Sequence, residues 1–313
     1  MQKASLVIGE ALVDEVTDLN GRQERIFGGS PANTALAISR LGVKSFFKGR
    51  ISLDPTGQDI KNYLNTAGVD VSASIEVSDK ALVIEAKIQP DGSAAYFADL
   101  TDCSDFGWSL EELDDPLPPG VVVVHLGSLT AATAPGAAAV ESWAREIKEQ
   151  KLATISFDPN IRPTLVQDAP ALKERVERIV AFSDLVKVSH EDLFWLDRES
   201  TPAQIAQRWL ASGVNAVIVT KAEAGASLFL KNNLEISLPA KKVNLIDTIG
   251  AGDTFAAALL AQLIDFNLVS NTGLNSQISI QQWQSLITNS LAAAAITCTR
   301  AGANPPTRDE VNW

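Results

Sequence analysis

The chain has 313 residues, 46% of them hydrophobic, which supplies enough apolar material for one large core. A net charge of -12 argues against nucleic acids and anionic membranes as partners, because both require a surplus of lysine and arginine. Two distant cysteines, Cys103 and Cys298, form neither a disulfide framework nor a zinc site, and no stretch approaches the ~20 apolar residues of a membrane span. We therefore expect a cytoplasmic protein, with residues 1–313 in a single domain, that acts on small molecules.

The N-terminal part begins with a predicted strand at residues 6–8, and Asp14 follows shortly after it. A loop carboxylate in that position can accept hydrogen bonds from two hydroxyl groups, or it can be a solvated surface acid. Residues 28–42 are predicted to form a helix that opens with Gly28 and Gly29. These glycines allow the backbone to approach a ligand closely, and Asn33 offers a donor and an acceptor to a hydroxyl unless it is a plain helix residue.

The next region, residues 81–100, has a different pattern from the rest of the chain. Residues 81–88 and 94–97 are strand-like, and a turn sequence at 90–92 separates them. Two such runs joined by a short turn predict a β-hairpin.

From residue 121 onward, short β-branched runs alternate with helical patterns. Strands are predicted at 121–124, 153–157, 185–188 and 216–220, and helices at 137–150, 171–182 and 202–212. This alternation is typical of an α/β fold, in which helices cover both faces of a mainly parallel sheet and ligands bind at the carboxyl ends of the strands. The polar segment 267–279 is predicted to be an irregular surface connection.

A short glycine-rich segment near the C-terminal end carries the clearest chemical signal. Gly250, Ala251 and Gly252 precede Asp253 and the apolar run 256–261, so a helix is predicted to start at a tight turn. The unpaired amides of a helix start favour an anion such as phosphate. A carboxylate at Asp253 would repel that anion, so its presence suggests a chemical role. One such role is to accept a proton from an attacking hydroxyl. We expect the helix start to lower the pKa of this carboxylate. A plain loop with an N-cap is the alternative.

Taken in order, several segments resemble the PfkB (ribokinase-like) family of carbohydrate kinases, and its fructokinases most of all. The resemblance is carried by residues 28–42 and 247–260 and by the shorter stretches 9–14, 157–163, 187–192 and 297–303. It implies a ribokinase-like sheet with a small β-sheet lid formed by residues 12–27 and 80–101. Closing the lid over a sugar would exclude water, a competing phosphoryl acceptor.

The resemblance also implies site residues. The sugar-binding set is Asp14, Gly28, Gly29, Asn33 and Arg162, while Gly250, Ala251 and Gly252 stabilise the transferred phosphoryl group and Asp253 is the base. Ser189, Thr220, Gly225 and Gly252 would bind the nucleotide, and Asp192 would organise magnesium through water. This chain departs from the family at three of these positions: Ser189 and Asp192 replace an asparagine and a glutamate, and Ala222 replaces a glycine. Residues 189–192 can also be interpreted as a helix cap followed by acidic residues in the first turn.

A second ion is implied near the turn. Many members of the family bind potassium with one carboxylate and main-chain oxygens at positions that match Asp247, Ile249, Arg300 and Gly302, although Asp247 can instead cap a turn.

We therefore expect a kinase that uses MgATP, with or without K⁺, to convert D-fructose to fructose 6-phosphate by direct in-line transfer. Another acceptor, such as 2-keto-3-deoxygluconate, is the alternative within the family, and a non-catalytic sugar-binding regulator is the alternative outside it. Partners are limited to sugar and ATP, with no nucleic acid or membrane, and the protein is expected to be a monomer or homodimer.

Overall fold

A computed structural model describes residues 2–17, 19–88, 94–165, 168–231 and 233–313. Its centre is an eight-stranded sheet in the order β14-β13-β12-β11-β10-β9-β1-β4. Neighbouring strands from β4 to β12 pair in parallel, and β13 and β14 join antiparallel at one edge. The strands are β1 (Ala4–Ile8), β4 (Lys44–Lys48), β9 (Val121–Gly127), β10 (Thr154–Asp158), β11 (Leu185–Ser189), β12 (Ala216–Thr220), β13 (Ala226–Leu230) and β14 (Leu234–Leu238).

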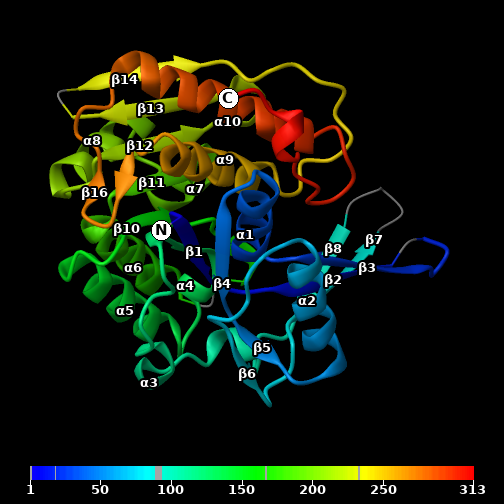
Figure 1. Cartoon of the computed structure of the whole chain (residues 1–313). Coiled ribbons are helices and arrows are strands. Elements are labelled where there is room, and N and C mark those ends of the chain that lie inside the picture. The colour runs from blue at the N-terminus through cyan, green and yellow to red at the C-terminus, as the bar shows by residue number, and fades with distance from the viewer. Residues whose placement is uncertain (1, 18, 89–93, 166–167, 232) are drawn as a thin grey trace.

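Helices cover both faces of this sheet, which confirms the predicted α/β architecture (Figure 1). In β1, Val7 packs into one apolar core and Leu6 and Ile8 into the other, because successive side chains of a strand point to opposite faces. The first core contains α1 (Ser30–Arg40), α2 (Pro55–Thr66), α9 (Ala251–Asp265) and α10 (Ile280–Thr297). The second contains α5 (Ala137–Glu149), α6 (Ala169–Phe182), α7 (His190–Leu196) and α8 (Pro202–Ser212), with the short α3 (Leu110–Leu113) and α4 (Ser128–Ala132) beside them.

A second, four-stranded sheet extends from the body of the molecule (Figure 1, right). Its order is β3-β2-β7-β8, with β2 (Leu12–Thr17), β3 (Gln23–Gly28), β7 (Val83–Ile88) and β8 (Ala94–Ala98). The antiparallel β7–β8 pair confirms the predicted hairpin, while its turn at 90–92 lies outside the described residues. β2 pairs antiparallel with β3 and parallel with β7. Asp14 lies within β2, so the expectation that it belongs to a loop was wrong.

Smaller elements complete the molecule. β5 (Arg50–Ser52) and β6 (Ile75–Val77) form a parallel pair, and single turns of 3-10 helix occur at Ser104–Phe106, Pro163–Leu165, Ala222–Ala224 and Arg308–Glu310. The segment 267–279 is not wholly irregular, because β15 (Val269–Ser270) pairs with β16 (Gly273–Leu274) and Leu268 and Val269 are buried. This pairing was missed from the sequence because polar residues dominate the segment and apolar ones such as Leu268 and Val269 are few among them. Within the described residues, no helix is both long and apolar enough to cross a membrane.

Candidate active site

The glycine-rich turn lies at the start of α9, as the sequence predicts. Gly250 is the N-cap in the left-handed conformation, with φ of 73°, and α9 begins at Ala251. A Cβ at position 250 would lie 2.7 Å from the Cβ of Ala303, and a Cβ at position 252 would lie 3.0 Å from Nζ of Lys187. Glycine is therefore required at position 250 by backbone conformation and by the contact with Ala303, whereas at position 252 it leaves room for the Lys187 ammonium. The Ala251 amide donates to the Thr248 carbonyl at 3.2 Å. The remaining amides of a helix start favour an anion in front of them, so anion binding here stays a prediction.

Asp253, in the first turn of α9, is held by two side chains from α1. Ser30 Oγ donates to Oδ1 at 2.6 Å, and Asn33 Nδ2 donates to Oδ2 at 3.0 Å. Burial raises the pKa of Asp253, and the hydrogen bonds from Ser30 and Asn33 and the charge of Lys187 only partly oppose this rise. The expectation that the helix start lowers this pKa was therefore wrong, since desolvation exceeds the effect of the helix dipole. A higher pKa makes the carboxylate a better general base.

Helix α1 is fixed at its start by the second glycine pair. Gly29 is the N-cap with φ of 99°, and a Cβ there would lie 2.6 Å from the carbonyl oxygen of Glu10. This contact packs the first turn of α1 against the connection between β1 and β2 and so brings Ser30 and Asn33 to Asp253. Asn33 donates its amide hydrogen to Asp253, and its binding of a sugar hydroxyl stays a prediction. Ser30 was missed, although its place directly after the glycine pair was a usable signal.

Asp14, Gly28 and Arg162 meet beside this cluster. A Cβ at position 28 would lie 3.0 Å from Oδ2 of Asp14, so glycine leaves the carboxylate room. Burial raises the pKa of Asp14, and the nearby Arg162 guanidinium partly opposes that rise. Arg162 is oriented by donating from Nη1 to Oδ1 of Asn160 at 2.7 Å. Three of the predicted sugar-binding residues thus come together from three separate parts of the chain.

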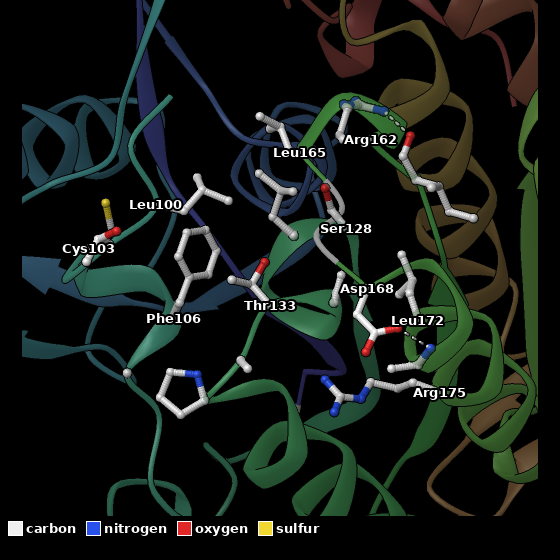
Figure 2. A pocket seen from close by; sticks show the side chains of 18 of the residues that line it. Leu100, Cys103, Phe106, Ser128, Thr133, Arg162, Leu165, Asp168, Leu172 and Arg175 are labelled. Atoms are coloured by element: carbon white, nitrogen blue, oxygen red, sulfur yellow. Dashed lines mark hydrogen bonds between the residues drawn. The ribbon is translucent and has the colours of Figure 1, made fainter. Parts of the chain in front are cut away.

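A cavity of 550 Å³ extends from Arg162 across the carboxyl ends of β9 and β10 (Figure 2). Apolar side chains such as Leu100 and Phe106 form one wall, and Ser128, Asp168 and Arg175 line the other side. This location agrees with the rule that ligands of open α/β sheets bind at the carboxyl ends of the strands. Because Arg162 belongs both to the cavity and to the surroundings of Asp14, the cavity adjoins the Asp14–Asp253 cluster.

A buried ion pair that the sequence analysis missed lies next to the turn. Nζ of Lys187 in β11 donates to Oδ2 of Asp158, the last residue of β10, at 2.7 Å. Both side chains are buried, and Oδ1 of Asp158 has no hydrogen-bond partner in the described part of the chain. The sequence signal was available, since a lysine in a buried strand is rare unless it is paired.

Asp192 lies close to this ion pair and is also buried. Its Oδ1 accepts a hydrogen bond from the Ile161 amide at 3.0 Å, while Ser189 caps α7 by accepting from the Asp192 amide at 2.9 Å. Burial raises the pKa of Asp192, and the charge of Asp158 raises it further. Carboxylate oxygens of Asp192 and Asp158 therefore fit a magnesium ion, directly or through water, because Mg²⁺ prefers oxygen ligands and relieves such repulsion. Ser189 is thus the N-cap of α7, as in the second interpretation of residues 189–192.

Two of the four residues expected to bind nucleotide, Thr220 and Gly225, lie between the carboxyl end of β12 and the start of β13, while Ser189 ends β11 and Gly252 lies in α9. Thr220 ends β12, and the Lys221 amide donates to the Gly225 carbonyl at 2.7 Å, which closes the turn to β13. Gly225 has φ of 90°, and a Cβ there would collide with the carbonyl of Leu238. Ala222 has φ of 47°, which explains why glycine suits that position and shows that alanine tolerates it here.

Asp247 joins two loops beside the turn. Its Oδ1 accepts from the Ile249 amide at 3.0 Å, and its Oδ2 accepts from the Gly302 amide at 2.8 Å. The carboxylate thus caps a turn, and it also brings three of the four predicted potassium-binding positions together. Arg300 precedes Gly302 in the same loop, and its side chain pairs with Glu310.

Comparisons with known proteins identify the family and the fold. The model of a family described as pfkB family carbohydrate kinase matches residues 5–310. A fructokinase from Rhizobium leguminosarum bv. trifolii is 31% identical over 278 residues, covering 85% of this chain and 81% of the relative. A fructokinase from Xylella fastidiosa with bound ATP superposes with a TM-score of 0.88 at 22% identity, covering 99% and 95% of the two chains. A fructokinase from Vibrio cholerae O395, solved with fructose, ADP and calcium, superposes with a TM-score of 0.79 at 26% identity, covering 96% and 94%.

Proposed function

Since this chain belongs to the pfkB family of carbohydrate kinases, and is thus an ATP-dependent sugar kinase, we propose that it converts D-fructose to fructose 6-phosphate. The observation that carries the mechanism is Asp253 beside the Gly250–Gly252 turn, which places a base next to an anion-binding helix start. The choice of fructose is supported by the fructokinase from Rhizobium and by the Vibrio cholerae fructokinase with bound fructose.

The transfer is a direct in-line displacement. The sugar hydroxyl gives its proton to Asp253 as its oxygen forms a bond to the γ-phosphorus, and the bond from that phosphorus to the bridging oxygen of ADP breaks. The amides of the Gly250–Gly252 turn stabilise the charge on the phosphoryl oxygens. Magnesium, when bound, would neutralise charge on the phosphates, and the buried carboxylates of Asp192 and Asp158 would hold it.

We assign acceptor binding to the residues around Asp14. Its carboxylate accepts hydrogen bonds from sugar hydroxyls, and Arg162 lies near enough to interact with the same ligand. Gly28 leaves room beside Asp14, and Gly29 lets the start of α1 pack against Glu10. A sugar hydroxyl replaces Ser30 or Asn33 as the donor to Asp253 when substrate binds. We assign nucleotide binding to Ser189, Thr220, Gly225 and Gly252, around the carboxyl ends of β11 and β12.

The four-stranded sheet is proposed to act as a lid within a single domain. Asp14 and Gly28 lie on its strands β2 and β3, so a movement of the sheet carries part of the sugar site with it. Closure around the acceptor excludes water from the transferred phosphoryl group.

A coupled assay of ADP release over fructose, tagatose, ribose, 2-keto-3-deoxygluconate and nucleosides tests the proposed acceptor. We expect the highest kcat/KM with fructose. A higher kcat/KM with 2-keto-3-deoxygluconate would show that this compound, and not fructose, is the preferred acceptor. No turnover above the background ATPase rate with any acceptor would contradict the kinase mechanism and favour a sugar-binding regulator.

A further inference from the structure

Lys187, in the buried strand β11, is charged, and packing alone does not explain a charged side chain there. A lysine in the interior of a parallel sheet loses its hydration, and one carboxylate seldom compensates fully. Lys187 donates one of its three ammonium hydrogens to Asp158, and no other hydrogen-bond acceptor is found for it among the described residues. Two donors of a fixed, buried cation therefore remain available.

The ammonium lies against the helix start that is expected to bind the transferred phosphoryl group. Its Nζ is 3.0 Å from the position that a Cβ on residue 252 would take, so glycine at 252 is what gives the ammonium access to the first turn of α9. Gly252 thus performs two functions, because it permits the turn and also admits a cation beside the turn's amides.

The charge around Lys187 is strongly negative. The Lys187 ammonium pairs with Asp158 at 2.7 Å, and Asp253 and Asp192 are its other charged neighbours. Three carboxylates surround this one ammonium, and an incoming ATP adds further negative charge. A fixed positive charge at this point opposes the repulsion between the phosphoryl group and the base.

We propose that Lys187 is a further catalytic residue, whose ammonium, anchored by Asp158 beside Gly252, donates a hydrogen bond to the phosphoryl group during transfer. Lys187 stays protonated throughout, because the proton of the sugar hydroxyl goes to Asp253 and the electron pair of the broken bond goes to ADP. The phosphoryl oxygens draw closest to these donors in the transition state, so the interaction acts mainly on kcat. This inference rests on the proposed kinase mechanism.

The test compares Lys187→Met, which removes the charge at similar length, with Lys48→Met. Lys48 is also buried on the central sheet, but it lies on the edge strand β4 against Trp108. We expect Lys187→Met to lower kcat by about 10²- to 10³-fold with little change in the KM for fructose. Lys48→Met should keep kcat within roughly threefold of the wild type.

Binding of a transition-state mimic separates catalysis from structure. With magnesium, fructose, ADP and aluminium fluoride, the affinity of Lys187→Met for the fluoride complex should fall by about the same factor as kcat, while its affinity for ADP alone stays unchanged. Equal losses for both ligands, or a kcat within roughly threefold of the wild type, would overturn the proposal. An inactive wild type would instead contradict the kinase mechanism itself.

If Lys187→Met fails to fold because Asp158 is left unpaired, Lys187→Met/Asp158→Asn removes both charges and keeps the test open. We expect this double variant to fold and to lose more affinity for the aluminium fluoride complex than Asp158→Asn alone, because Asp158 is also assigned to magnesium. Normal turnover in the double variant would reject the role of the ammonium.

Discussion

At the scale of single residues, burial decides how Asp253 behaves. The carboxylate lies at a helix start, which favours its ionised form, but the loss of solvent acts more strongly and raises its pKa. Ser30 and Asn33 hold both oxygens in place without removing their capacity to accept a proton. The site thus combines a fixed orientation with increased basicity, which is what a general base requires.

Replacing the base gives the most direct test at this scale. Asp253→Asn keeps the size of the side chain but cannot accept a proton, so kcat should fall by ~10²- to 10⁴-fold with little change in ATP affinity. Asp14→Ala is the matched comparison, since loss of an acceptor for sugar hydroxyls should weaken sugar use by about 1–3 kcal/mol. Steady-state kinetics with both substrates measures each effect, and near-normal turnover of Asp253→Asn would remove this residue from the mechanism.

The raised pKa of Asp253 also predicts a pH dependence. The base must be ionised to accept a proton, so kcat/KM should fall on the acidic side of a pKa that lies above the ~3.9 of an ordinary aspartate. Measuring kcat/KM of the wild type against pH, over the range in which the fold is intact, locates this acidic decrease. A flat profile down to pH ~4 would show that desolvation does not raise this pKa in the free enzyme.

At the scale of elements, the start of α9 depends on loops that come from two parts of the chain. Asp247 receives amide hydrogen bonds from Ile249 on its own loop and from Gly302 on the loop after α10. Gly250 packs against Ala303 of that second loop. The direction of the turn's amides is therefore set by the contact between these loops as well as by the glycines.

A monovalent cation at Asp247, Ile249, Arg300 and Gly302 would strengthen this contact. Replacing sodium with potassium at constant ionic strength should raise kcat, roughly fivefold or more, because the ion fixes the loop that aims the amides. Asp247→Ala should abolish the response to potassium. Initial rates in potassium, sodium and a bulky organic cation provide the measurement, and identical rates in all three would reject the ion site while leaving the kinase assignment intact.

At the scale of the whole molecule, two buried acidic residues, Glu10 and Asp105, lie where the four-stranded sheet joins the body. Asp105, directly after the lid, accepts from the Ala11 amide at 2.9 Å, and Glu10 accepts from the amide and hydroxyl of Thr130 in α4. Burial raises the pKa of Asp105 to about 7, and the charge of Glu10 contributes to the increase. The segment before β2 and the segment after β8 are thereby joined through a carboxyl group whose pKa is near neutral.

This carboxyl group should make the fold less stable as the pH rises. Between pH ~4 and pH ~7 the native protein keeps a proton on Asp105 that the unfolded chain has released, so the free energy of unfolding falls with increasing pH. Asp105→Asn removes this contribution and can still accept from the Ala11 amide. The difference in the free energy of unfolding, variant minus wild type, should increase by about 1–4 kcal/mol from pH 5 to pH 8 when measured by urea unfolding. Parallel pH dependences of the two proteins would contradict the raised pKa.

The sequence by itself determined the class of fold and the reactive turn. Strands at 121–124 and 216–220 and the helix at 202–212 were predictable because continuous β-branched runs and helical periodicity are local patterns. Gly250, Gly252 and Asp253 were predictable for the same reason, since a turn and the helix after it involve consecutive residues. The same applies to Gly28 and Gly29 before α1.

Only the tertiary structure decided which residues meet at the base and how they are charged. Ser30 lies 223 residues from Asp253, and Lys187 reaches Gly252 from the centre of the sheet, so neither contact has a local pattern. The direction of the pKa shift at Asp253 could not be predicted either. It depends on how much solvent the packed elements exclude, and the helix dipole that the sequence reveals is the weaker effect.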